Sequence, residues 1–475
     1  MLRVLRAHRV WLAVRLAVVL PLILVMSGCA AANAAWRAGP MGMAAEWTIR
    51  DHLAYGRAEQ AWAAMGDHNI APRDALLRHM YRGVISLHAG QYEQGAKSID
   101  RAWSIVDDRF TRRISRGAVS LVTSDASLPY YPLPTERLFI PYYGAMNWLA
   151  MGEMESASVE ARRLAMMLQA EGEQKPTPEL EGALRYITGV LFEAAGDRQD
   201  AQVAYRNAAV LLGTLPGDTL SAGADSGDVV VIVEDGFVAR PQPQSLAVYT
   251  SDGEFSALRS GRDADRILVA NRVRDRARDP HWRAPNVGWL TYEVNWATIG
   301  SGTPSNTAVE VTTNPRAFAA LTAQVSPSVA QDFTALVPEK LARGIARAAV
   351  RHAALTAASH QMDGAIARND DDDDDDDDGP TAGARVFRAL FGLLLGGLAV
   401  SSTVIDQPDL RAWQVLPDRL TIARLRLPVG EHPIYVSQGT KPMRIGTATV
   451  RNGGVAVMHY RLWPGPGGRQ LTATK

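Results

Sequence analysis

An internal repeat in the first half of the chain limits the folds that the protein can adopt. The repeat consists of three segments that align without a gap, YRGVISLHAGQYEQGAKSIDRA, YGAMNWLAMGEMESASVEARRL and ITGVLFEAAGDRQDAQVAYRNA. A small residue lies near the start of each segment, at Gly83, Ala145 and Gly189, and seven residues later each segment has a glycine. Later positions also correspond in residue type, which indicates a repeated structural unit.

The spacing within each segment predicts a pair of antiparallel helices. A glycine in the left-handed conformation ends the first helix, and small residues let the second helix pack closely against it. This is the pattern of tetratricopeptide repeats, and LAYGRAEQAWAAM is a weaker half-match that keeps Gly56, Ala61 and Met65 at the same offsets. Because the distance between repeats is irregular, unrelated helix pairs remain an alternative.

The amino terminus predicts export and a lipid anchor. Several arginines precede an apolar run from Leu16 to Met26, which is typical of a secretory signal. Ser27 and Gly28 before Cys29 resemble the lipobox of bacterial lipoproteins. That resemblance implies cleavage before Cys29, lipid on its sulfur and, with alanine next, an outer-membrane lipoprotein facing the periplasm. The alternative is an ordinary signal peptide with an incidental cysteine. With one cysteine, an intramolecular disulfide and a multi-cysteine zinc site are excluded.

The second half has mixed patterns. Val229 to Gly236, VVVIVEDG, predicts a buried strand, and the alternation in WLTYEVNWATI predicts another. An amphipathic helix is expected from Pro327 to about Ile366, and a β-hairpin is expected around the turn at Asn452 and Gly453. The predicted fold class is therefore α+β, with N-terminal tetratricopeptide-like helical repeats followed by a mixed α/β C-terminal domain.

Two further segments have biased composition. The aspartate run at 370–378 predicts a solvated, disordered insertion, since calcium loops need spaced carboxylates with a turning glycine. The apolar run at 386–405 predicts a core helix, with membrane insertion as the alternative. The predicted organisation is a signal peptide (1–28), a lipidated linker (29–45), a repeat domain (46–215), a mixed α/β domain (228–368), an aspartate-rich insertion (369–383), and an apolar helix with a C-terminal β-rich module (384–475).

The chain resembles a family of bacterial lipoproteins with tetratricopeptide-like repeats. The segments that carry the resemblance are RISRGAVSLVTSDASLPY, ERLFIPYYGAMNWLAMGEMESASVEARR and YITGVLFEAAGDRQDAQVAYRNA, with DLRAWQVLPDRLTIARLRLPVGEH near the end. The resemblance spans about residues 46–432. It implies an exported lipoprotein with a helical-repeat half, and it brings no activity and no catalytic residues.

The sequence has none of the motifs that would mark a catalytic or cofactor site. There is no HExxH pair, no GxSxG turn and no SxxK motif accompanied by its transpeptidase partners. We therefore expect no catalytic residues, no metal site and no cofactor. The charges balance, with 50 basic and 50 acidic residues, so nucleic acid is not an expected partner.

The function predicted from these patterns is a membrane-anchored periplasmic scaffold that binds a protein or peptide partner, with cell-envelope or cell-wall assembly as the expected setting. The polar and aromatic residues expected to face the groove of the repeats are Tyr81, Asn147, Trp148, Arg185 and Tyr186. The alternative is an envelope enzyme with a site between the two halves, where His281, Glu293 or His432 would meet a carboxylate. A third reading places the apolar run at 386–405 in a membrane assembly.

Overall fold

The computed structural model describes residues 43–65, 73–111, 128–170, 175–217, 225–251, 289–299, 308–313, 316–341, 408–439 and 442–464, with a few shorter stretches, among them 343–344 and 469–470. These residues form an α+β protein in which helices dominate the N-terminal half and strands the C-terminal part, as the sequence predicts. Cys29, the aspartate run at 370–378 and the apolar run at 386–405 lie outside the described residues, so the predictions made for them stay predictions. Among the described helices, none has the length and apolar content needed to cross a bilayer.

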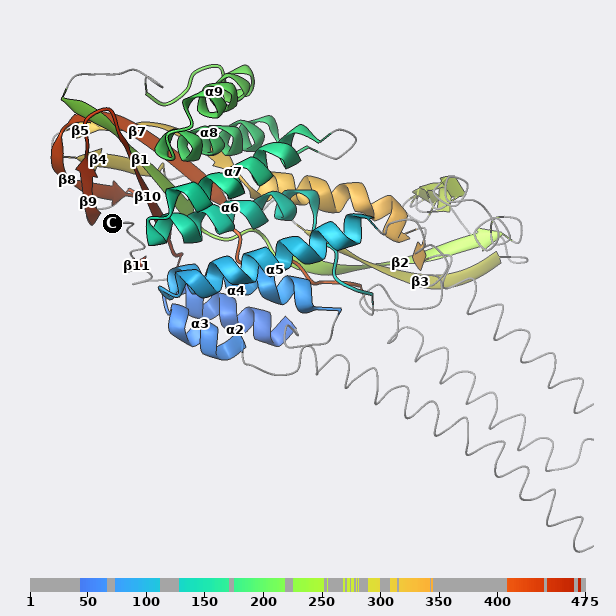
Figure 1. The fold of residues 1–475 in the computed structure, drawn as a ribbon. Helices are drawn as coiled ribbons and strands as arrows, with labels where there is room; N and C mark the ends of the chain where they lie inside the picture. The colour runs from blue at the N-terminus through green and yellow to red at the C-terminus, as the bar shows by residue number, and fades with distance from the viewer. Residues whose placement is uncertain are drawn as a thin grey trace, which may run out of the picture.

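The described helices of the N-terminal half are arranged as consecutive antiparallel pairs (Figure 1). A glycine with positive φ lies in the turn of each pair: Gly56 at 68°, Gly90 at 73°, Gly152 at 80° and Gly196 at 85°. Residues with a Cβ rarely adopt this conformation, which explains why the glycine recurs in the sequence. The pairs are α2 (Met43–Ala54) with α3 (Ala58–Met65), α4 (Ala75–His88) with α5 (Tyr92–Thr111), α6 (Pro134–Met151) with α7 (Met154–Gln169), and α8 (Pro178–Ala194) with α9 (Arg198–Leu212).

Within a pair, residue size at two facing positions is matched. A Cβ built on Gly83 would lie 2.3 Å from the side chain of Ile99. A Cβ on Gly189 would lie 2.6 Å from the ring of Tyr205. The equivalent residues of the middle pair are Ala145 and Ala161, both of which are buried. A glycine on the first helix thus accompanies a large residue on the second, which fills the space that the missing side chain leaves.

The strands form a five-stranded sheet and a four-stranded sheet, with a separate two-stranded ribbon. The larger sheet has the order β11-β10-β1-β7-β6, with β1 parallel to β10 and antiparallel to β7. The smaller sheet has the order β5-β4-β8-β9. The strands are β1 (Ser226–Asp235), β4 (Glu310–Thr313), β5 (Arg316–Ala317), β6 (Ala319–Gln324), β7 (Arg419–Pro428), β8 (Gly430–Ser437), β9 (Met443–Val450), β10 (Val455–Leu462) and β11 (Arg469–Gln470).

The predicted strand at Val229 to Gly236 is confirmed as β1, which is buried on both faces. Val230 and Ile232 belong to the core shared with the helices, while Val231 and Val233 belong to the core shared with the smaller sheet. A strand covered on both sides reads as a continuous apolar run, as this one does. The molecule therefore has a helical layer, a central sheet and an outer sheet, which Figure 1 shows as the helices lying against one side of the strands.

The hairpin predicted around Asn452 and Gly453 is wrong, although the chain does turn there. Gly453 has a φ of 63°, but β9 joins the smaller sheet and β10 joins the larger sheet beside β1. The backbone of the turn bonds to β1, with Gly453 N–H donating to the Ser226 carbonyl at 2.8 Å. Both strands still bury their apolar residues, because the two sheets pack face to face around a common core.

The predicted division into units at 228–368 and 384–475 is also corrected. Strands β1 and β6 from the first range alternate with β7 and β10 from the second within a single sheet. The ladder of β1 with β10 runs from Asp228 opposite Val455 to Asp235 opposite Leu462. Hydrogen-bonded neighbours in one sheet share one fold, so these ranges are not separate domains.

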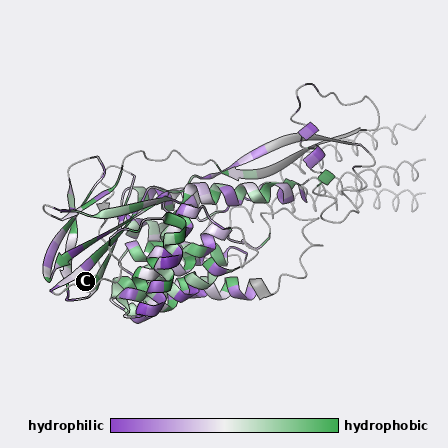
Figure 2. Cartoon of the chain, turned by 90° about the horizontal axis from the view of Figure 1, so that it is seen from above, coloured by the Kyte–Doolittle hydropathy of each residue, from purple (hydrophilic) through white to green (hydrophobic). Residues whose placement is uncertain are grey.

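The ribbon consists of β2 (Pro241–Ser251) and β3 (Trp289–Ile299), which confirms the strand predicted in WLTYEVNWATI. Figures 1 and 2 both show it extending away from the two packed sheets. The predicted helix after Ser326 is also present and is described from 326 to 341. Its apolar positions Val329, Phe333 and Leu341 are buried, as its amphipathic pattern predicts.

Candidate functional site

Residues 408–418 cross the inner face of the helical layer before β7 begins, and we call this segment the strap. Trp413 of the strap is fully buried, and its backbone N–H donates to Glu136 of α6 at 2.6 Å. The Gln414 side chain donates to Glu46 of α2 at 2.6 Å. Arg411 donates to Asp74 beside α4 at 2.7 Å. The face of the repeats that was expected to hold a partner is thus covered by the chain itself.

Three of the five predicted partner contacts therefore point into the protein, and their assignment to a solvent-facing groove is wrong. Tyr81 is fully buried, and its hydroxyl donates to the Ala412 carbonyl of the strap at 3.1 Å. Asn147 is also fully buried and donates to the Tyr143 carbonyl at 2.7 Å.

The third of these residues is Tyr186, and the remaining aromatic, Trp148, also has structural contacts. Tyr186 is fully buried, and its hydroxyl donates to the Pro216 carbonyl at 2.8 Å. Trp148 is half-buried and packs against the main core. Arg185 lines a pocket on the outer side of the helices, not on the inner face where the five residues were expected.

A buried polar cluster lies between the helices and the central sheet, where an enzyme site would be expected. Glu234 of β1 is fully buried and accepts hydrogen bonds from Tyr142 at 2.8 Å and Tyr143 at 3.0 Å, both on α6. It also accepts from His459 at 3.0 Å and from Arg461, both on β10. Burial opposes ionisation of this carboxyl, but His459 and Arg461 outweigh that effect and hold its pKa well below the usual range.

Titratable groups from both halves do converge in this cluster, but its side chains leave no room for a substrate to reach them. His88 of α4 lies with its ring 6.0 Å from that of His459, and it is only 4 % exposed. Burial lowers the pKa of His88 well below its usual value, so the ring is neutral. Every carboxylate oxygen of Glu234 is already paired with a neighbour. The cluster joins the two layers, which accounts for its charges without chemistry.

The residues named for the enzyme alternative do not belong to this cluster. His281 is exposed, and its backbone N–H binds the Asp279 side chain at 2.8 Å. The ring of His432 contacts the Pro428 carbonyl at 2.8 Å. The side chain of Glu293 lies outside the described residues. Within the described part of the chain, no group of histidine, cysteine and acidic residues has the geometry of a metal site.

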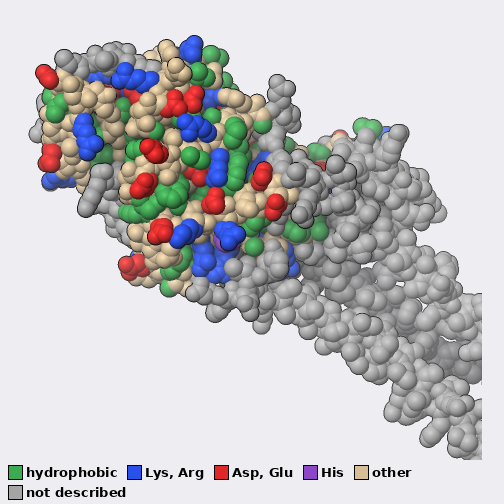
Figure 3. Space-filling model, in the orientation of Figure 1, with side chains coloured by type: hydrophobic (Ala, Val, Ile, Leu, Met, Phe, Trp, Pro, Cys, Tyr) green, Lys and Arg blue, Asp and Glu red, His purple; other side chains and the backbone are tan. Residues whose placement is uncertain are grey.

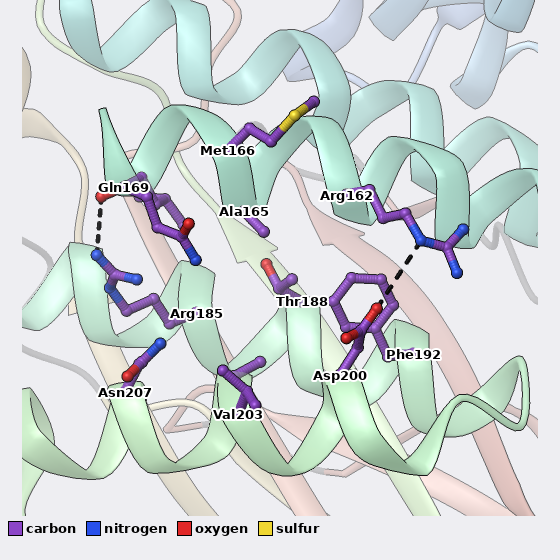
Figure 4. A pocket seen from close by; sticks show the side chains of 12 residues that line it. Arg162, Ala165, Met166, Gln169, Arg185, Thr188, Phe192, Asp200, Val203 and Asn207 are labelled. Atoms are coloured by element: carbon purple, nitrogen blue, oxygen red, sulfur yellow. Dashed lines mark hydrogen bonds and ion pairs between the residues drawn. The ribbon is translucent and has the colours of Figure 1, made fainter. Parts of the chain in front are cut away.

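An open groove of about 250 Å³ lies between α7 and α9, with α8 as its floor, and we call it the outer groove (Figure 4). Apolar side chains line its centre, among them Met166 above and Val203 below, with Phe192 on the floor. Met166 is 60 % exposed and Val203 is 43 % exposed. Its lining residues are Arg162, Ala165, Met166, Leu168, Gln169, Arg185, Thr188, Phe192, Asp200, Val203, Ala204 and Asn207.

Polar groups lie at both ends of the outer groove. At one end Arg185 donates to the Leu168 carbonyl at 2.8 Å and to Glu181 at 2.6 Å, with Asn207 nearby. At the other end Arg162 donates to Asp197 at 3.0 Å and lies over the ring of Phe192. These ion pairs fix the arginines in place, so the groove has an apolar centre and a preformed polar rim, the usual anatomy of a recognition surface.

The apolar residues of the outer groove continue along both of its walls. Val159 is 47 % exposed and lies seven residues before Met166 on α7, while Val210 is 84 % exposed and lies seven residues after Val203 on α9. A spacing of seven keeps both members of each pair on one side of a helix. Figure 3 shows that green side chains of the helical face occur in patches separated by acidic and basic groups.

Our sequence reasoning missed these residues because the repeat pattern directs attention to the inner face. The signal that could have found them is an apolar residue at a position where the second helix of a pair should meet water. Val159 with Met166 and Val203 with Val210 are such pairs, since neither fits the small-residue register of the repeats. No protein-family model, curated protein or solved structure matched the chain.

Proposed function

We propose that the protein is a lipid-anchored scaffold of the bacterial cell envelope that binds a protein partner in the outer groove. The observation that carries the proposal is the concentration of exposed large apolar side chains on α7 and α9, at Val159, Met166, Val203 and Val210. Large apolar side chains exposed in a groove with a polar rim cost free energy in water, and such patches commonly mark an interaction site. The predicted lipid on Cys29 would hold this surface near the membrane.

The helical walls of the outer groove and the spacing of their apolar side chains favour an amphipathic helix as the part of the partner that binds. The walls are two helices, and the apolar side chains recur along them at a helical spacing. A partner helix lying between α7 and α9 would bury its apolar anchors in the centre and place its polar residues against Arg162 and Arg185. Helix-in-groove recognition uses such anchors on one face of the bound helix.

Site-specific photo-crosslinking in the native envelope tests the proposal. A photoreactive residue at Met166 or at Val203 should capture the same partner, identified by mass spectrometry. The control position is Lys97 on α5, whose side chain is 73 % exposed, and it should capture nothing specific. With the partner purified, Met166→Glu combined with Val203→Glu should weaken binding at least tenfold, because a charge in the apolar centre would be buried. Equal capture from all positions, or unchanged affinity, would contradict the proposal.

The anchor has its own test. Cys29→Ala should move the protein from the membrane to the soluble periplasmic fraction while the partner still binds the purified variant. A variant that stays in the membrane would refute lipidation at Cys29 and leave the outer groove unaffected.

A further inference from the structure

A second, polar pocket lies on the opposite side of the α8–α9 turn from the outer groove. Its volume is about 240 Å³. It lies where the turn faces the start of β1, the end of β7 and the turn between β9 and β10, and we call it the turn pocket. Its lining residues are Glu193, Ala194, Gly196, Arg198, Ser226, Gly227, Asp228, Arg426, Gly453, Gly454 and Val455.

The carboxylates of the turn pocket are occupied by arginines of the protein itself. Asp228 is 3 % exposed and accepts from Arg424 Nε at 2.9 Å and from Arg426 Nε at 2.8 Å. Glu193 accepts from Arg424 Nη1 at 2.9 Å and from the Tyr205 hydroxyl at 2.6 Å. Each carboxylate oxygen of Asp228 and Glu193 therefore already accepts a hydrogen bond.

Donors on two arginines are left over. Arg426 uses Nε and Nη2 on Asp228, and within the described residues nothing accepts from its Nη1. Its side chain remains 30 % exposed. Arg198 is exposed at the start of α9, and no acceptor for its guanidinium occurs in the described part of the chain. The lining balances Arg198 and Arg426 against Glu193 and Asp228, and Arg424, which bonds to both carboxylates without lining the pocket, adds a further positive charge.

The fixed position of Arg426 matters for recognition. Asp228 holds its guanidinium through two bonds, at 2.8 and 3.0 Å, and Arg424 holds Asp228 in turn. A guanidinium that is already oriented loses little conformational entropy when it binds, and its planar donors match the oxygens of a carboxylate or phosphate. The neighbouring glycines leave room beside it, since a Cβ on Gly196 or Gly453 would meet no atom within 4 Å.

We propose that the turn pocket binds the oxyanion group of a small ligand, a carboxylate or a phosphate, through Arg198 and Arg426. The volume of the pocket is below that of a typical drug-sized site, so the ligand is small. The site is independent of the outer groove, and its occupant would stabilise the contact between the α8–α9 turn and the central sheet. Binding to the folded state alone raises apparent stability.

Titration of the full-length protein with inorganic phosphate and with succinate, each at an ionic strength matched with sodium chloride, tests this site. Either anion should raise the melting temperature above the chloride control, and the anion that does so identifies the oxyanion class. Arg198→Gln and Arg426→Gln should each weaken binding at least tenfold. Arg198 is exposed, so its substitution leaves the fold intact even if the change at Arg426 does not.

The matched control is Arg206→Gln, an exposed arginine on the same helix that bonds only to the Gln202 carbonyl at 3.4 Å. This variant should bind the anions as the unchanged protein does. The proposal is overturned if neither anion acts beyond chloride, or if Arg198→Gln binds with the same affinity as Arg206→Gln.

Discussion

Several charged side chains lie in the interior of this protein, at positions where strand alternation would normally predict contact with water. Arg424 and Arg461 are at most 1 % exposed. Each is bonded to a carboxylate on another element, Arg424 to Asp228 and Arg461 to Glu234. Removing one member of such a pair is costly because the remaining charge is left buried without its partner.

Glu160 on α7 allows the cost of a buried carboxylate to be measured. It is 5 % exposed, and burial raises its pKa to about 7, only partly offset by Arg163. With a raised pKa in the folded state, the contribution of this carboxyl to stability is most favourable below pH 4.5, falls as the pH rises to about 7, and levels off above that. Glu160→Gln should match the unchanged protein near pH 4.5 and be more stable by about 1–3 kcal/mol at pH 8, measured by urea unfolding.

Glu93 on α5 supplies the control for this pH dependence. It is fully exposed and bonded to Lys97 at 2.7 Å, so Glu93→Gln should not reproduce the gain at pH 8. If Glu160→Gln gives the same difference in unfolding free energy at both pH values, its carboxyl does not titrate in this range.

Substitution of two tyrosines tests their corrected placement inside the protein. Tyr81→Phe removes a hydroxyl that donates to Ala412 and accepts from Gln414, each at 3.1 Å. Tyr186→Phe removes one bond, to Pro216. We expect about 1–3 kcal/mol of destabilisation for the first change and about 1 kcal/mol for the second.

Neither tyrosine variant should alter partner affinity at a temperature where the variant is folded. Chemical unfolding and binding measurements on the same preparations separate the two effects. A loss of affinity with unchanged stability would restore these tyrosines as partner contacts.

At the scale of the elements, the helix pairs depend on matched residue sizes. Gly83 and Ile99 in one pair correspond to Ala145 and Ala161 in the next. Gly83→Ala should destabilise the protein by about 1–3 kcal/mol because the new methyl overlaps Ile99. Combined with Ile99→Ala, the change should cost less than the sum of the two single variants, since the double variant recreates the alanine pair of the neighbouring repeat.

A thermodynamic cycle measured by urea unfolding checks this coupling. The control cycle combines Gly83→Ala with Ala201→Gly on α9, far from the facing pair, and these two changes should be additive. Additive costs in both cycles would show that the two positions do not determine the spacing of the helices.

Local signals in the sequence were sufficient to predict the helix pairs and some of the strands. Glycines at fixed offsets predicted the turns of the helix pairs, and their positive φ angles confirm why glycine is needed. The apolar run of β1 predicted a buried strand, and the structure shows it buried on both faces. Pairing between strands could not be predicted in this way. Strand β10 pairs with β1, which lies more than two hundred residues earlier in the chain. The alternation of apolar and polar residues in β10 would be the same whichever sheet it joined.

The candidate site was predicted less well than the elements, for a related reason. The polarity of Tyr81 and Asn147 suggested a partner, but the Tyr81 hydroxyl donates to the strap, and the Asn147 amide donates to the carbonyls of Tyr143 on its own helix and Gly83 on α4. A segment more than 260 residues away from Asn147 in sequence gives no local sign that it will cover the inner face. Arg185 was predicted to face the same inner groove, but it lines the outer groove instead, so its role in binding stays a prediction.

At the scale of the whole molecule, the helices and the central sheet share one core. Residues from α4, α6 and α8 belong to the same buried cluster as Ile232, Ile422 and Trp413. The polar contacts of Glu234 and Arg424 connect the same two layers. Shared burial of this kind makes unfolding cooperative, so neither layer should keep its structure when the other is lost.

Arg461→Met tests this cooperativity by disturbing the layers at their contact. It leaves Glu234 buried without its arginine, and we expect a loss of about 3–5 kcal/mol. Because the pKa of Glu234 is depressed in the folded state, its contribution is present above pH 4.5 and declines as the pH falls. The deficit of Arg461→Met should therefore be largest near neutral pH.

Circular dichroism of the helices and fluorescence of the interface tryptophans should report the same urea midpoint. Adding Glu234→Gln should recover part of the loss, since it removes the unpaired charge. Two separate midpoints would show that the helical layer and the sheets unfold independently.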